Sequence, residues 1–156
     1  MRRIIWQTIA EFLGITEPTA ALTGASATTF LRGDGTWSGL GTAATVSTTD
    51  ATVTTIATIA IPSSTTVAIE AVVRARRTGG AAGTAEDAAA YSIFACYKNA
   101  AGTATEVGET LVSALEDQAG WACSFSASSS NALLRVTGAV DNNVDWAATY
   151  RTYTVT

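Results

Sequence analysis

The sequence predicts a mainly β protein, an antiparallel β-sandwich or jelly-roll-like knob over residues 51–156, preceded by a short N-terminal helix and an extended arm over residues 1–50. Apolar and polar residues alternate with a period of two from about residue 51 onward, as they do in half-buried strands. Clusters of Gly, Ser and Asn interrupt this alternation at regular intervals, as turns do. Residues 15–50 are rich in Thr, Ala, Gly and Ser and lack such a pattern, which indicates an arm that lies on a partner.

The clearest strand is expected at 66–77, where Val67, Ile69, Ala71 and other odd-numbered residues share one face. Further strands are expected at 51–61, around 91–97, and at 104–115, 120–127, 131–138 and 144–155, with a hairpin connection at 99–102. Such short, evenly spaced strands are typical of a sandwich or jelly roll. In the last strand Trp146 and Tyr150 share a face and are predicted to be core, whereas Tyr153 points oppositely. The alternative is that these three aromatics form a carbohydrate-stacking patch.

The first segment, 1–14, is expected to be an amphipathic helix that ends at Gly14, before Pro18. Its apolar surface consists of Ile4, Ile5, Trp6, Ile9, Phe12 and Leu13. A helix this short is marginal alone in water, so this surface must be buried. We expect it to be buried on another protein; the alternative is that the helix folds back on its own knob.

The composition excludes several function classes. The chain carries a net charge of −4 with 14% charged residues, which offers no basic footprint for nucleic acid. No apolar run is long enough to insert in a membrane. Without histidine the chain lacks the commonest general base and metal ligand, and no catalytic residue, cofactor or metal is expected. A glycosidase needs only two carboxylates, so a depolymerase stays as an alternative that the missing histidine and the sparse charge disfavour. Its two cysteines are expected to be reduced, with a mutual disulfide as the alternative.

Some short segments match, or partly match, the sequence motifs of known binding sites. Arg32-Gly33-Asp34 matches an integrin-binding tripeptide, but Gly33 and Gly35 favour a turn. The glycine-rich segment 78–83 lacks the Lys-Ser or Lys-Thr of a phosphate-binding loop, so a surface loop is expected. The segment 141–145 offers oxygen ligands without the spacing of a calcium loop, and a plain turn is expected.

Two segments resemble proteins of tailed bacteriophages. The segment 27–37 resembles a "TTFLRGDGTW" segment common in phage tail fibres, and its motif residues are Phe30, Leu31, Arg32, Gly33, Asp34, Gly35 and Trp37. The chain from Ile56 onward is similar to a C-terminal module of phage fibre and decoration proteins, through the segments 57–62, 76–80, 116–121, 136–138 and 142–146.

The resemblance implies a location in the virion, a β-rich structure and trimerisation. We therefore expect a non-enzymatic structural protein, a short homotrimeric tail fibre or capsid decoration protein. Residues 1–50 would attach it to a capsid, tail or baseplate protein, with the six apolar residues of the helix as the anchor. The alternative is a short tail fibre that binds a host receptor or surface glycan.

Overall fold

The computed structural model describes residues 29–31, 37–39 and 41–156, and the chain divides into two compact units, Met1–Leu40 and Gly41–Thr156. In the first unit, β1 (Thr29–Leu31) and β2 (Trp37–Gly39) pair antiparallel, with Leu31 opposite Trp37. The ends of the fibre-type motif therefore form strands. The remaining motif residues, 32–36, and the expected helix with its anchor residues at 4–13 lie outside the described residues.

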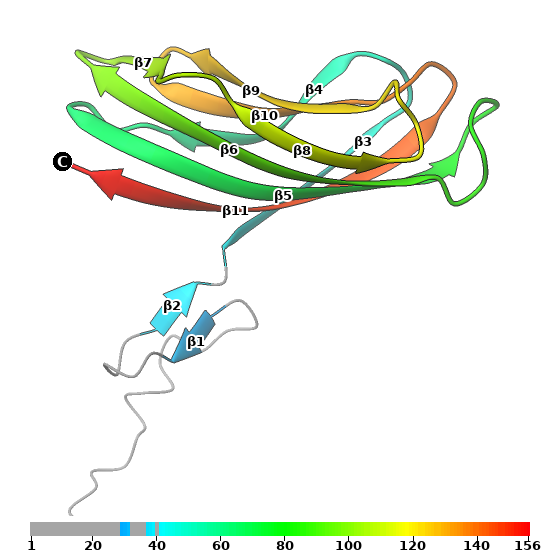
Figure 1. Ribbon diagram of the computed structural model, residues 1–156, viewed down its shortest axis with the longest axis horizontal. Helices are drawn as coiled ribbons and strands as arrows, with labels where there is room; N and C mark the ends of the chain where they lie inside the picture. Colours follow the sequence, from blue (N-terminus) through cyan, green and yellow to red (C-terminus); the bar gives the residue numbers. More distant parts are fainter. Residues whose placement is uncertain (1–28, 32–36, 40) are drawn as a thin grey trace, which may run out of the picture. The chain divides into compact units, whose positions relative to one another are not determined.

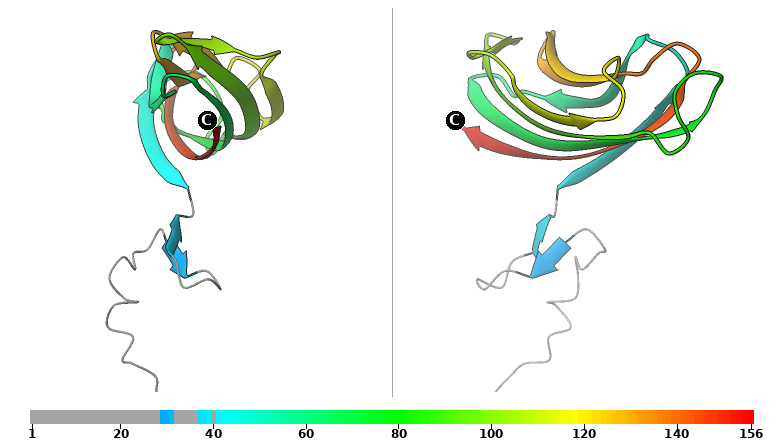
Figure 2. Two further views of the ribbon diagram at one scale, coloured as in Figure 1. Left: turned by 90° about the vertical axis from the view of Figure 1, so that its left-hand side faces the viewer. Right: turned by 45° about the vertical axis from the view of Figure 1, so that its right-hand side comes forward.

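The second unit consists of two antiparallel sheets (Figure 1). The larger has the order β3-β11-β5-β6-β7, with β8 also paired to β6, and the smaller has the order β4-β10-β9. The strands are β3 (Thr42–Thr48), β4 (Val53–Ala60), β5 (Thr65–Gly79), β6 (Ala88–Ala100), β7 (Thr103–Glu106), β8 (Leu111–Glu116), β9 (Ala122–Ser128), β10 (Asn131–Thr137) and β11 (Asn143–Val155). The larger sheet curves around the smaller one (Figure 2). A mainly β, antiparallel fold is thus confirmed.

One core lies between the two sheets, and every second residue of the strands contributes a side chain to it. On β5 the odd-numbered residues from Val67 to Ala75 are buried, and on β6 so are Tyr91, Ile93 and Tyr97. The smaller sheet contributes residues such as Leu134, which is fully buried. Trp146 on β11 is 1% exposed, so its predicted core position is confirmed.

Tight turns join the strands at clusters of small and polar residues, where the sequence predicts turns. Ala101 and Gly102 both have positive φ, 56° and 90°, as the two central residues of a type I′ hairpin require, and they connect β6 to β7. Asn99 stabilises this turn, because its Oδ1 accepts a hydrogen bond from the Gly102 amide at 2.9 Å. Its Nδ2 also donates to the Ile61 carbonyl at 2.6 Å, which ties the hairpin to the end of β4.

Two differences from the expected strands are informative. The single strand expected at 104–115 is two strands, β7 and β8, which pair with successive stretches of β6, and the ladder is interrupted between them, where Gly108 has a φ of 75°. Residues 42–48, expected in the arm, form β3, which pairs along β11 from Thr48–Val144 to Thr42–Tyr150. The division therefore falls after residue 40 rather than after residue 50, because residues 41–50 contribute a strand to the larger sheet.

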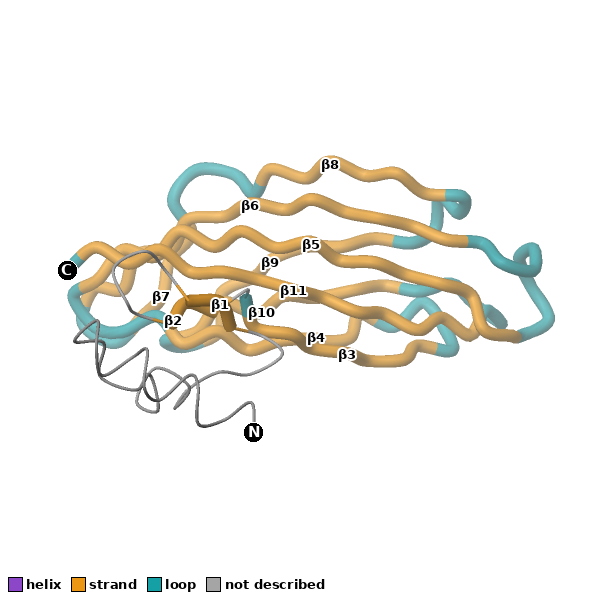
Figure 3. Tube along the Cα trace, turned by 90° about the horizontal axis from the view of Figure 1, so that it is seen from below, coloured by secondary structure: helices purple, strands orange, loops and turns teal. Residues whose placement is uncertain are grey.

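The larger sheet ends in β8 on one side, as Figure 3 shows, where β8 is the outermost strand beyond β6. Among the described residues, no strand other than β6 pairs with β8. All six residues of β8 are exposed.

Candidate binding groove

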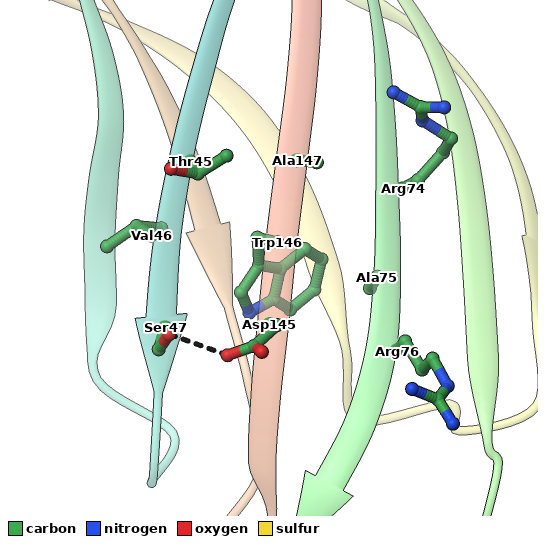
Figure 4. A pocket seen from close by; sticks show the side chains of 9 residues that line it. All are labelled: Thr45, Val46, Ser47, Arg74, Ala75, Arg76, Asp145, Trp146 and Ala147. Carbon is green, nitrogen blue, oxygen red and sulfur yellow. Dashed lines mark hydrogen bonds between the residues drawn. The ribbon is translucent and has the colours of Figure 1, made fainter.

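A shallow groove lies on the outer face of the larger sheet, over β3, β11 and β5 (Figure 4). It has a volume of about 560 Å³, which falls within the range of small-molecule sites. The residues that line it are Thr45, Val46, Ser47, Arg74, Ala75, Arg76, Asp145, Trp146 and Ala147.

Strand register explains the shape of the groove. Ala147 on β11 lies between Thr45 on β3 and Arg74 on β5, and the small alanine side chain forms the floor between two larger neighbours. One row along, Asp145 lies between Ser47 and Arg76. Outward-facing residues of three strands are thereby brought together from segments far apart in the sequence.

Three of the polar side chains in the groove already make hydrogen bonds. The Ser47 hydroxyl donates a hydrogen bond to Asp145 Oδ1 at 2.6 Å. Arg76 donates to Glu86 Oε2 from Nη2 at 2.5 Å and from Nε at 3.1 Å. Hydrogen bonding to Glu86, together with its charge, raises the pKa of Arg76 above its ordinary value.

Arg74 is different, because it makes no hydrogen bond or ion pair with any residue that the structure describes. The groove therefore presents one guanidinium that has no partner among the described residues, beside the hydroxyl of Thr45 and the hydrogen-bonded pair of Ser47 and Asp145. A guanidinium binds carboxylate and phosphate groups, and the hydroxyls exchange hydrogen bonds with polar ligands. This donor set fits recognition of an anionic, hydroxylated ligand.

The aromatic patch considered from the sequence does not form. Trp146 is buried and Tyr150 packs against the core, whereas Tyr153 is 52% exposed on the other face of β11. The Tyr153 hydroxyl donates to Glu70 Oε2 at 3.1 Å. The prediction that the first two residues are core is confirmed.

The glycine-rich loop between β5 and β6 is closed by its own polar groups. Asp87, 8% exposed, accepts hydrogen bonds at Oδ2 from the Thr84 amide at 2.6 Å and from Gln118 Nε2 at 2.7 Å. Arg77 donates to two loop carbonyls, those of Gly80 and Ala82. These contacts give the loop a structural role.

Both cysteines are free thiols. Cys123 is 7% exposed on β9, and burial raises the pKa of its thiol to about 12. Such a thiol is protonated at neutral pH and is a poor nucleophile. Cys96 is half-buried on β6.

Within residues 29–31, 37–39 and 41–156, no three His, Cys, Asp or Glu side chains come together as a metal-binding group. The same residues contain no helix long and apolar enough to span a membrane.

The alternation of the sequence over 66–77 puts Arg74 and Arg76 on the face opposite the apolar residues, and both are exposed. It had not indicated Thr45, Ser47 or Ala147, because the groove exists only once β3 is paired with β11.

No protein-family model matches the chain, and no curated protein matches it in sequence. Among solved structures, the chain is similar to the tailspike protein of Acinetobacter baumannii phage AM24, with 13% sequence identity and a TM-score of 0.39. The likeness covers 72% of this chain and 26% of the tailspike chain, so this chain spans about a quarter of the length of that protein. A TM-score this low identifies neither fold nor function.

Proposed function

We propose that this chain is a non-enzymatic structural protein of a tailed-bacteriophage virion, a short fibre or decoration protein fixed to the particle through its N-terminal region. The observation that carries this proposal is the fibre-type segment 27–37. The mainly antiparallel β fold of residues 41–156 is compatible with it. The absence of histidine from the sequence and the buried, protonated Cys123 thiol support a role without catalysis.

The proposed assembly is a homotrimer, as in the fibres that the segment 27–37 resembles. Low charge density supports self-association, because only 14% of residues are charged against about 25% in typical soluble proteins. A trimer would also multiply the attachment points of the N-terminal region. The mass measured by sedimentation should be three times the 16.0 kDa chain mass, or a multiple of that value.

The experiment that tests the anchor is Phe12→Asp. Burial of the apolar N-terminal residues contributes roughly 1.5–3 kcal/mol for each side chain, and a carboxylate in that surface opposes burial. We expect the variant protein to keep its melting temperature and to be lost from purified virions.

The matched control is Glu11→Gln, which alters the neighbouring residue without placing a charge among the apolar ones. It should load normally onto particles. Normal loading of the Phe12→Asp protein would contradict the proposed anchor, and a lowered melting temperature would indicate that the segment packs on its own knob.

A second candidate function, adhesion to a host surface glycan, is favoured by Arg74 in the outer-face groove, whose guanidinium no described residue pairs with. A sugar carboxylate could pair with Arg74 while its hydroxyls meet Thr45 and Ser47. Oligogalacturonate is a suitable acidic probe, with neutral maltooligosaccharide for comparison. We expect Arg74→Ala to raise the dissociation constant for the acidic probe about tenfold, the loss of one charge-assisted hydrogen bond.

Lys98→Ala is the matched control, since it removes the same charge from exposed β6 outside the groove. It should leave the dissociation constant unchanged. Equal loss in both variants would mean that the acidic sugar responds to overall charge and that the groove is not its site.

A further inference from the structure

The edge strand β8 exposes large apolar side chains, which the free surface of a soluble protein seldom gathers on one strand. Leu111 is 65% exposed, Val112 47% and Leu115 75%. Leu111 and Leu115 lie on one face of the strand and Val112 on the other, so both faces carry uncovered apolar side chains. On the Leu111 face, Phe94 of β6 extends the apolar surface and is 43% exposed.

This edge also lacks the features that keep sheet edges from pairing. Natural edge strands carry lysine, proline or a bulge. The five residues Leu-Val-Ser-Ala-Leu contain neither a charge nor proline, and they pair with β6 without a register shift. Its free edge therefore offers a row of backbone donors and acceptors that a second strand can pair with.

The sequence of β8 is self-complementary about Ser113, and on this ground we propose that β8 pairs antiparallel with β8 of a second copy of the chain. A two-fold axis at Ser113 places Leu111 opposite Leu115 of the other copy, and Leu115 opposite Leu111. On the other face the same axis places Val112 opposite Ala114. Large aliphatic pairs face each other on one side, and large faces small on the other.

Neighbouring acidic residues fix this register. A shift that moves the axis from Ser113 to Ala114 brings Leu111 opposite Asp117, and a shift that moves it to Val112 brings Leu115 opposite Glu109. The Glu116 carboxylate is itself held in place, because the Tyr91 hydroxyl donates to its Oε2 at 2.6 Å. Of these three axes, only the one at Ser113 places each leucine opposite a leucine.

Two-fold pairing has a consequence for the size of the assembly that is separate from the proposed function. A two-fold contact joins chains in pairs, so the number of chains must be even. Combined with the proposed trimer, closed dihedral symmetry gives six chains. Without the trimer, the same contact gives a dimer.

The experiment compares two double variants of the full chain with the wild type by sedimentation at about 10 μM. Leu111→Lys with Leu115→Lys places like charges opposite each other in the proposed register. Leu111→Glu with Leu115→Lys places opposite charges there. We expect the like-charge variant to have half the wild-type mass and the opposite-charge variant to keep the wild-type mass, with a new sensitivity to salt.

Val155→Lys is the control, because Val155 is 71% exposed on β11 of the same sheet, away from this edge. It should keep the wild-type mass. An odd number of chains in the wild type, or the same mass for both double variants, would overturn the pairing. A mass that is not a multiple of three chains would instead overturn the trimer, so the two proposals fail separately.

Discussion

At the scale of single residues, a hydrogen bond between Trp146 and Thr48 connects β3, the first strand of the larger sheet, to the core. The indole Nε1 donates to Thr48 Oγ1 at 2.9 Å, and both residues are almost fully buried. Thr48→Val keeps the shape of the side chain and removes the acceptor. We expect the free energy of unfolding to fall by about 1–3 kcal/mol, the cost of an unpaired buried donor, as measured by urea denaturation.

Thr45→Val on the same strand is the control, because Thr45 is exposed and its change leaves no buried group unpaired. Its effect should stay within about 0.5 kcal/mol. Equal effects of the two substitutions would show that the Trp146 bond does not stabilise the protein.

The same pair of residues shows which properties of a single residue could be predicted from the sequence and which could not. The core position of Trp146 followed from its parity in an alternating strand. Its partner could not be found, since Thr48 lies 98 residues earlier in a segment whose Thr and Ser give no hydrophobic alternation. A hydrogen bond between distant strands depends on the register, which the local pattern does not contain.

At the scale of elements, alternation located the strands of both sheets except β3, and it joined β7 and β8 into one. The strands β5, β6, β10 and β11 were predicted close to their observed positions, because each buries one face of large apolar residues. The strand β3 was missed, as Val46 is its one large apolar residue. The open edge at β8 could not be predicted either, because Leu and Val residues in a strand indicate burial. Only the strand pairing shows that nothing among the described residues covers them.

At the scale of the whole molecule, the candidate groove depends on where the second unit begins. The sequence placed residues 1–50 together, whereas residues 41–50 belong with the sheets. Two of the groove residues on β3, Thr45 and Ser47, come from this segment. The arginines of β5 alone would be a solvated face, and β3 makes them one wall of a groove.

This division gives a prediction about two fragments of the chain. The fragment 41–156 retains β3, whereas the fragment 51–156 lacks it. Loss of β3 exposes one edge of β11 along its pairing from Val144 to Tyr150 and leaves the Trp146 indole without its acceptor. We expect the longer fragment to fold, and the shorter one to melt at least about 5 °C lower by circular dichroism, since even 1 kcal/mol shifts the melting temperature by a few degrees in a domain of this size. Equal melting temperatures would mean that β3 adds no stability and that a boundary after residue 50 describes the folding unit.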